Sequence, residues 1–271
     1  MSHTAELIAV GTELLLGEIA NTDAQVISRG LSELGINVFY HTVVGDNPER
    51  LRRAVDIAKS RAGVIITTGG LGPTCDDLTK TVLAAAFGKE LVYNQEAARR
   101  IEDYFARSGR TLTGNNYQQA YLPAGCTPFQ NDWGTAPGCG FECDGVRVVM
   151  LPGPPSECGP MFRERALPYL SDLADGAIHS RSLRLFGKGE SAVEALLRDK
   201  MNAMHNPTLA PYAKEGEVEL RLTAKADTLA RAQALIAPEE AALREKLGEL
   251  VYGADEDSLE GVCLALLKER G

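Results

Sequence analysis

The chain has 271 residues, of which 44% are hydrophobic and 24% charged, and its net charge is −9. These values are typical of a globular protein with one large or two ordinary domains. The acidic balance argues against a general nucleic-acid or membrane-surface binder, and no apolar run approaches the roughly 20 residues that span a bilayer. The N-terminus lacks a signal-peptide pattern and the six cysteines form no disulfide framework, so we expect a cytoplasmic protein with reduced thiols.

Strand and helix patterns alternate over the first 70 residues. Apolar runs at 7–10, 38–44 and 64–68 predict buried strands. Thr22 and Gln25 form a capping-box pattern for a helix that ends near Leu34, and Asn47-Pro48 predicts the start of a second helix. Strands separated by helices indicate an α/β fold, with a mostly parallel sheet covered by helices on both faces.

The patterns that follow complete a first domain, which we place at residues 1–172. Helices are expected at about 77–87 and 95–107. Asp144-Gly145 lies between two short apolar runs, which is a strong signal for a β-hairpin. A helix with Met161 and Phe162 facing inward should close the domain near residue 170, and 171–176 reads as a linker.

A smaller α+β domain is expected at residues 177–254. Its predicted strands are 183–186, 217–223 and 250–252, and its predicted helices are 192–201 and 230–247, the latter interrupted or restarted at Pro238. The loop at 187–190 invites comparison with the GXXG loop of RNA-binding KH domains. Its spacing is wrong and it follows a strand, so we do not expect nucleic-acid binding. An apolar helical stripe from Leu259 to Leu267 then needs a surface to pack on.

A glycine-rich turn follows the third predicted strand. It contains Gly69, Gly70, Gly72, Pro73 and Thr74, and its backbone amides would suit a phosphate. The turn lacks the lysine of a P-loop, and its glycine spacing is not that of a dinucleotide-binding fingerprint. A tight turn that needs glycine for its backbone conformation is the alternative. We favour a ligand site, because ligands of open α/β sheets bind at the carboxyl ends of the strands.

Asp76 and Asp77 stand at the same turn and would repel a bare phosphate. A divalent cation such as Mg²⁺, Mn²⁺ or Co²⁺ that bridges carboxylate and phosphate oxygens removes this conflict, so we predict a metal site at these two residues. Asp77 has an alternative role in a capping box with Thr74 as the N-cap. Lys80 is either a phosphate clamp or a surface partner of the aspartates at helical spacing.

The loops after neighbouring parallel strands should face the same cleft. Gly11, Thr12 and Glu13 follow the first strand; Glu13 could bind metal or act as a base, and Thr12 could donate to phosphate. Asp46 is a weaker candidate, because Asn47 and Pro48 already explain its turn. Small-residue loops also permit close approach to a ligand, and the candidates there are Gly134, Thr135, Ala136, Gly153 and Pro154.

Taken together, these motifs resemble the CinA family of competence/damage-inducible proteins. The matching stretches are 10–17, 44–48, 67–74, 134–138, 151–155 and 206–216. The resemblance implies a first domain with the molybdopterin-binding fold of MoaB- and MogA-like proteins, a KH-like second domain and a homodimer. Cys75 departs from the family pattern, in which a charged or polar residue is more usual.

The resemblance also implies an activity: metal-dependent hydrolysis of the pyrophosphate bond of ADP-ribose to AMP and ribose 5-phosphate. Many family members continue into a nicotinamide mononucleotide deamidase domain. Residues 255–271 resemble its start, and we assign no deamidase activity. Two alternatives stay open, a protein that binds molybdopterin and a non-catalytic interaction module.

Overall fold

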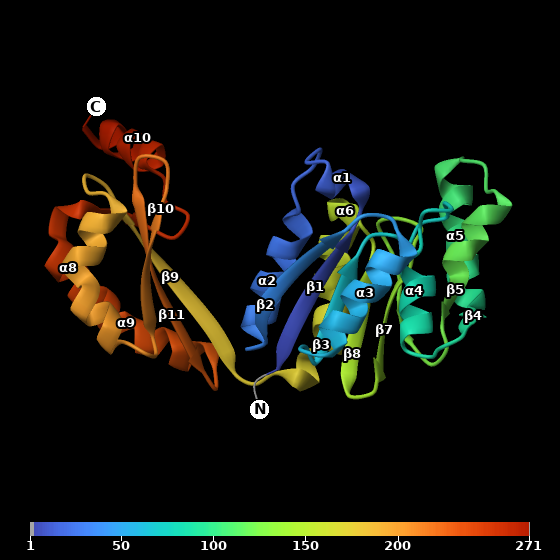
Figure 1. Cartoon of the computed structure of the whole chain (residues 1–271). Helices are drawn as coiled ribbons and strands as arrows, with labels where there is room; N and C mark the ends of the chain where they lie inside the picture. The colour runs from blue at the N-terminus through green and yellow to red at the C-terminus, as the bar shows by residue number, and fades with distance from the viewer. Residues whose placement is uncertain (1–2, 271) are drawn as a thin grey trace. The chain divides into compact units, whose positions relative to one another are not determined.

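The structure is a computed structural model that describes residues 3–270. The chain divides into two compact units, Met1–Asp175 and Gly176–Gly271, and each is described by itself (Figure 1). Within residues 3–270, no helix is both long enough and apolar enough to cross a membrane.

The first unit is built on a six-stranded sheet in the order β2-β1-β3-β8-β7-β6. The first four strands in this order are parallel, and β7 and β6 are antiparallel additions. Asp144 and Gly145, with φ of 52° and 74°, form the hairpin turn between β7 and β8 that the sequence predicts. The strands are β1 (Thr4–Val10), β2 (Asn37–Val44), β3 (Val64–Thr68), β6 (Thr127–Phe129), β7 (Gly138–Cys143) and β8 (Val146–Leu151).

Helices cover both faces of this sheet, which confirms the predicted fold class (Figure 1). On one face, α3 (Pro48–Lys59) and α4 (Thr79–Ala86) bury side chains such as Val55 and Leu83. On the other face, α2 (Thr22–Glu33) and α6 (Pro155–Met161) bury Ile27 and Met161. The remaining elements of the unit are α1 (Thr12–Leu15), α5 (Gln95–Ser108), a 3-10 helix (Gly114–Ala120), a π-helical turn (Phe162–Ala166), α7 (Leu167–Tyr169), a 3-10 turn (Ser171–Leu173) and the strand pair β4 (Leu91–Tyr93) and β5 (Tyr121–Pro123).

Two predicted helix starts have different outcomes. Asn47 caps α3 as expected, since its side chain accepts a hydrogen bond of 3.0 Å from the Arg50 amide. The capping box of Thr22 and Gln25 is wrong by one position, because Asn21 caps α2 by accepting a 3.1 Å hydrogen bond from the Ala24 amide. Asn is among the strongest N-cap residues, so it takes this role ahead of the adjacent threonine.

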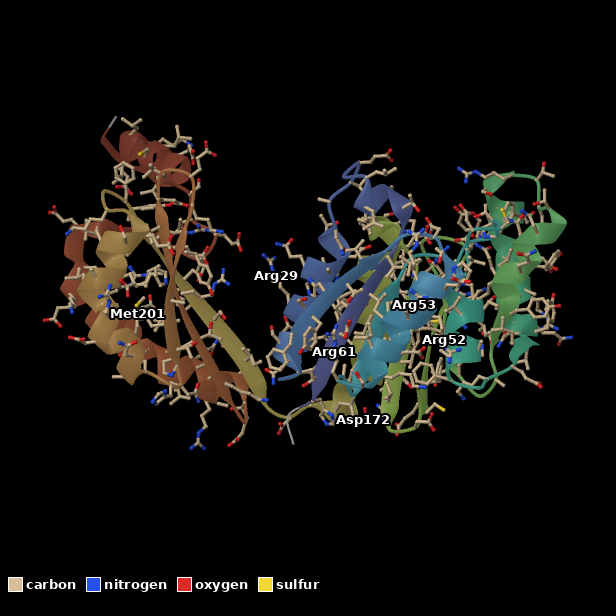
Figure 2. All side chains as sticks on the ribbon, viewed as in Figure 1. Arg29, Arg52, Arg53, Arg61, Asp172 and Met201 are labelled. Atoms are coloured by element: carbon tan, nitrogen blue, oxygen red, sulfur yellow. The ribbon has the colours of Figure 1, made fainter. Side chains whose placement is uncertain are left out.

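An ion pair joins β1 to the turn that follows α3. Glu6 is fully buried and accepts hydrogen bonds from Arg61, labelled in Figure 2, at 2.8 Å on each carboxylate oxygen. Thr42 on β2 donates a further bond of 2.7 Å to the same carboxylate. Arg61 thus balances the negative charge of Glu6, and a buried carboxylate requires such a partner.

The second unit has a four-stranded antiparallel sheet in the order β10-β11-β9-β12, and the expected small α+β fold is present. Its core combines Leu183, Leu220 and Leu222 from the sheet with Val193 and Leu243 from the helices. Its elements are β9 (Ala177–Leu185), α8 (Glu190–Ala203), β10 (Thr208–Ala213), β11 (Val218–Ala226), α9 (Leu229–Leu247), a 3-10 turn (Gly248–Leu250), β12 (Val251–Ala254) and α10 (Leu259–Arg270).

Two features of this unit differ from the sequence prediction. Helix α9 runs without interruption through Pro238. Pro238 is exposed, as is Ala234 four residues before it, so the carbonyl that loses its partner is close to water. Strand β10 was not predicted; it is an edge strand with Pro211 in its middle, a position that proline tolerates only at the edge of a sheet.

Candidate active site

A cleft of about 490 Å³ lies at the carboxyl ends of the parallel strands. The loops after β1, β2, β3 and β8 contribute to it, as the positional argument predicts. Its lining consists of Val10, Gly11, Glu13, Ile19, Asp46, Gly69, Gly70, Leu71, Gly72, Pro73, Asp76, Asp77, Gln119, Thr135, Ala136, Pro152, Gly153, Pro154, Pro155 and Glu157.

Most of the candidate residues are brought together there, but four are not part of the lining. Thr12, Thr74, Lys80 and Gly134 are absent from the walls of the cleft. Several residues that line the cleft were not predicted from the sequence, notably Gln119 and Glu157.

The glycine-rich turn brings two strands into close contact. Gly69 and Gly70 have φ of 89° and 67°, and a Cβ at Gly69 would overlap the carbonyl oxygen of Val10. A Cβ at Gly153 would lie 3.2 Å from the Cα of Gly69. Backbone geometry therefore accounts for these glycines, which supports the alternative of a tight turn without excluding a ligand.

Three consecutive amides of this turn remain available to a ligand. The amide of Gly69 donates to the Leu151 carbonyl (3.1 Å), and the amide of Thr74 donates to the Asp77 carboxylate (2.8 Å). Within residues 3–270, the N–H groups of Gly70, Leu71 and Gly72 have no hydrogen-bond partner. The amides that could hold an anion are thus those of residues 70–72 rather than the whole of 69–74.

Asp77 is not a helix cap. Its carboxylate accepts hydrogen bonds from the amide and hydroxyl of Thr74, as a capping box requires, but α4 begins only at Thr79. The two residues instead close a turn that precedes the helix, so the capping interpretation is wrong. Asp76 is exposed beside them, and hydrogen bonding from Thr74 lowers the pKa of its carboxyl.

Three carboxylates of the site lie directly over glycines. A Cβ on Gly11 would be 2.5 Å from the Glu13 carboxylate, and one on Gly72 would be 2.5 Å from that of Asp77. A Cβ on Gly134 would overlap the carboxylate of Glu157. These glycines leave the space that the acidic side chains occupy.

Thr12 and Asp46 bond to each other and join the loops after β1 and β2. Asp46 Oδ2 accepts from the Thr12 amide (2.9 Å) and from its hydroxyl (2.7 Å), and the Asp46 amide donates to the Thr12 Oγ1 (3.2 Å). The Thr12 hydroxyl therefore donates to Asp46 rather than into the cleft. Of this pair, Asp46 is the member that lines the cleft.

Lys80 is a structural residue. It is 6% exposed, and its Nζ donates to the backbone carbonyls of Gln118 and Gln119 at 3.0 Å each. The expected surface ion pair is thus wrong, and the position argues against a phosphate clamp. Burial lowers the pKa of Lys80 to about 8, against the opposing influence of Cys139 and Asp77.

Gln119 combines burial with an incomplete set of hydrogen bonds. It is 1% exposed and donates from Nε2 to Thr135 Oγ1 (3.1 Å), while its Oε1 has no partner within residues 3–270. Gln119 lies in a 3-10 helix that is far in sequence from the carboxyl ends of the parallel strands, so no sequence pattern pointed to it. Glu157 did have such a signal, because it follows the carboxyl end of β8 by a few residues.

The cleft is strongly acidic. Its lining contains five carboxylates, those of Glu13, Asp46, Asp76, Asp77 and Glu157, and no lysine, arginine or histidine among the residues described. Across residues 3–270, no three His, Cys, Asp or Glu side chains lie close enough to form a complete metal site. The residues thus fit a hard cation that takes one or two carboxylates here and completes its shell with substrate oxygens and water, as Mg²⁺ commonly does.

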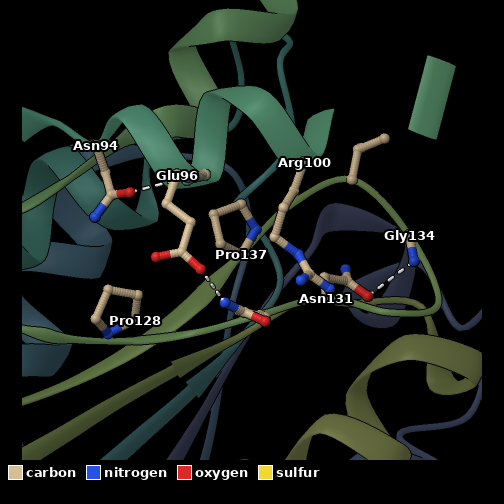
Figure 3. Close-up of a pocket in the computed structure, with 10 residues that line it drawn as sticks. Asn94, Glu96, Arg100, Pro128, Asn131, Gly134 and Pro137 are labelled. Carbon is tan, nitrogen blue, oxygen red and sulfur yellow. Dashed lines mark hydrogen bonds between the residues drawn. The ribbon is translucent and has the colours of Figure 1, made fainter. Parts of the chain in front are cut away.

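A smaller cavity of about 120 Å³ adjoins this cleft and shares Thr135 with it (Figure 3). Its other walls come from the start of α5 and from residues 128–137. The groups in it are largely bonded to one another: Asn94 accepts from the Ala97 amide (2.9 Å), and Gln130 donates to Glu96.

Comparison with known proteins gives consistent matches to both units. Residues 6–172 match the model of a probable molybdopterin binding domain, and residues 180–253 match the KH domain of the damage-inducible protein CinA. A CinA-like protein of Dictyoglomus turgidum is 50% identical over 266 residues, and a putative competence-damage inducible protein of Bacillus thuringiensis is 50% identical over 268 residues. Each match covers 98% of this chain and 65% of the relative, so the chain spans about two thirds of their length.

Among solved structures, the protein CinA of Thermoplasma acidophilum, described as of unknown function, is similar to this chain. It is 31% identical with a TM-score of 0.56, and the match covers 64% of this chain and 98% of the other. The similarity supports the α/β architecture described above.

Proposed function

Because this chain belongs to the CinA family, we propose that its cleft hydrolyses the pyrophosphate bond of ADP-ribose or a related nucleotide, with a divalent metal as cofactor. One observation carries the proposal: three unpaired amides and five carboxylates line the same cleft. Amides suit phosphate oxygens and carboxylates suit a hard cation, and a nucleotide pyrophosphate with its metal contains both partners.

The residues of the cleft have distinct roles in this proposal. The amides of residues 70–72 hold phosphate oxygens, and Asp76 and Asp77 hold the metal. A divalent ion bound there would offset part of the negative charge of the cleft and polarise the phosphorus. Thr74 holds the Asp77 carboxylate in place through a 2.8 Å hydrogen bond from its amide. Lys80 has no place in the reaction, because it is bonded to the backbone beneath the site.

The test is direct. The purified protein is incubated with ADP-ribose and Mg²⁺, Mn²⁺ or Co²⁺, and AMP is measured. We expect turnover that requires metal and falls at least about 100-fold in Asp76→Asn/Asp77→Asn, since the variant loses charge stabilisation of the transition state. Asp56→Asn, which alters only a surface ion pair on α3, is the matched control. Absence of AMP with every metal would contradict the proposal.

Binding of a pterin is the second candidate, because residues 6–172 match the model of a probable molybdopterin binding domain. The same cleft would serve, with the pterin phosphate on the amides of residues 70–72. Tight pterin binding without hydrolysis of ADP-ribose would favour this function. A chain whose melting temperature responds to neither ligand would favour a non-catalytic interaction module.

A further inference from the structure

Glu157 lines the cleft close in sequence to the loop that follows β8. It stands in the first turn of α6, directly after the loop that follows β8. The loops after β8 and β3 approach closely, since a Cβ on Gly153 would be 3.2 Å from the Cα of Gly69. Glu157 is half-buried and has no ion-pair partner within residues 3–270. Glu157 therefore lines the same cleft as Gly70, Leu71 and Gly72, and no cation within residues 3–270 pairs with its carboxylate.

Asn131 holds this carboxylate in position. Its Nδ2 donates to Glu157 Oε2 (2.6 Å) and to the Ala136 carbonyl (2.9 Å). Its Oδ1 accepts from the amides of Trp133 (3.0 Å) and Gly134 (2.8 Å), and Figure 3 shows the bond from Gly134. These four bonds use the whole hydrogen-bonding capacity of the amide. Asn131 is thus rigid, and it engages one oxygen of Glu157 while the other, Oε1, has no partner within residues 3–270.

The other carboxylates of the cleft are less suited to proton transfer. Asp46 is engaged by both donors of Thr12. Asp76 and Asp77 are assigned to the metal. Glu13 is exposed on a short helix, and no side chain within residues 3–270 donates a hydrogen bond to it. Asp46 and Asp77 also keep one oxygen without a partner within residues 3–270, but each accepts two hydrogen bonds on its other oxygen. Among the described carboxylates of the cleft, Glu157 is the one that accepts a single hydrogen bond, from a group that orients it, which is the arrangement expected of a base and its orienting partner.

We infer that Glu157 is the general base of the reaction and Asn131 its positioning residue; the inference rests on the proposed hydrolysis of a nucleotide pyrophosphate. A water molecule gives a proton to Glu157 Oε1 as its oxygen forms a bond to phosphorus. The bridging P–O bond breaks, and its electron pair stays on the phosphate that leaves. Later transfer of the proton from Glu157 to solvent restores the carboxylate.

The first experiment compares Glu157→Gln with the unaltered chain in metal-dependent hydrolysis of ADP-ribose. The amide retains the size and the hydrogen bond to Asn131 but cannot accept the proton. We expect kcat to fall about 10²- to 10⁴-fold, the range for loss of a general base, with KM changed less than about threefold. Binding of Mn²⁺, measured by calorimetry, should be unchanged. Glu164→Gln, an exposed glutamate shortly after α6, is the control.

The second experiment uses Asn131→Asp, which keeps the acceptor for the Trp133 and Gly134 amides but loses the donor to Glu157. We expect a fall in kcat of about tenfold or more with little change in KM, whereas a merely structural role would change both. Full activity in Glu157→Gln overturns the inference while the proposed function stands. The same holds if Glu157→Gln loses both its activity and its binding of Mn²⁺. An unaltered chain without turnover overturns the proposed function and this inference with it.

Discussion

At the scale of single residues, the positions of the acidic side chains in the site depend on neighbouring glycines that have no side chain. Gly11, Gly72 and Gly134 each lie beneath a carboxylate that a Cβ would displace. None of the three positions has a φ in the left-handed region, so alanine would meet the carboxylate rather than a forbidden backbone conformation. Substitution there tests the position of the acidic groups with little effect on the chain around them.

Gly72→Ala should lower metal-dependent turnover, because the new Cβ would lie 2.5 Å from the Asp77 carboxylate and force it to move. We expect at least about a tenfold loss, since displacement by about 1 Å at a reacting centre costs up to 100-fold. Gly63→Ala is the control, as nothing lies within 4 Å of the Cβ that it adds. Equal turnover in the two variants would show that Asp77 need not hold its observed position.

The buried Lys80 predicts a dependence of stability on pH. Its pKa is about 8 in the folded chain and 10.5 in the unfolded one, so between these values the unfolded chain binds the extra proton. Folding stability should therefore rise as pH increases from about 8 to 10.5, by up to about 3 kcal/mol. Denaturant unfolding of the unaltered chain and of Lys80→Met measures this, because groups common to both cancel in the difference. If the difference in folding stability between the unaltered chain and Lys80→Met does not change with pH, the prediction is contradicted.

At the scale of elements, β11 carries a buried charge on the face of its sheet away from the helices. Glu219 is 4% exposed and accepts hydrogen bonds from Ser182 (2.7 Å) and Arg221 (2.6 Å). Burial raises the pKa of Glu219, but these bonds and the charges of Arg221 and Lys214 outweigh burial and lower the pKa to about 2. The network ties β11 to β9 beside it.

This network should weaken in acid. The folded pKa of Glu219 is below the unfolded value of 4.5, so its contribution is complete above pH 4.5 and is lost as pH falls towards about 2. Glu219→Gln should be less stable at neutral pH by about 1–3 kcal/mol, the usual cost of a disturbed buried network, and should lack this pH dependence. Thermal unfolding between pH 2 and 7 provides the measurement, with the exposed Glu245→Gln as control. If both variants follow the same pH curve, the network contributes no charge-dependent stability.

At the scale of the whole molecule, the two units have separate cores. The apolar clusters of the first unit contain only residues up to Leu173, and that of the second begins at Leu183. Every residue that lines the acidic cleft belongs to the first unit.

A chain cut after Asp175 should fold and keep metal-dependent turnover. The cut retains the 3.1 Å hydrogen bond from the Asp175 amide to the Leu34 carbonyl and all of the sheet. We expect kcat within about threefold of the full chain and a cooperative thermal transition, as for a domain of ordinary size. An insoluble or inactive fragment would show that the second unit supports the site, for instance through the homodimer that the family resemblance implies. Sedimentation of the full chain checks that dimer independently.

The sequence by itself determined the class of fold, the three strands of the first 70 residues and the end of the sheet at which the cleft lies. These follow from local patterns: apolar runs separated by amphipathic helices, Asn47 as a cap, and the Asp144-Gly145 turn. Local rules also placed most of the loops that meet at the cleft, because parallel strands bring their carboxyl ends to one edge.

Only the tertiary structure decided what each candidate side chain does. Lys80 looked like a surface cation and is buried under the site, while Thr74 and Asp77 looked like a helix cap and close a turn. Gln119 comes from a 3-10 helix outside the sheet, and Asn131 comes from the loop after the antiparallel edge strand β6. Glu157 is oriented by Asn131 and occupies the space that Gly134 leaves open. The physical reason is the range of the interactions: periodicity and turn chemistry act over a few neighbouring residues, whereas burial and hydrogen-bond partners depend on which distant segments the fold brings together.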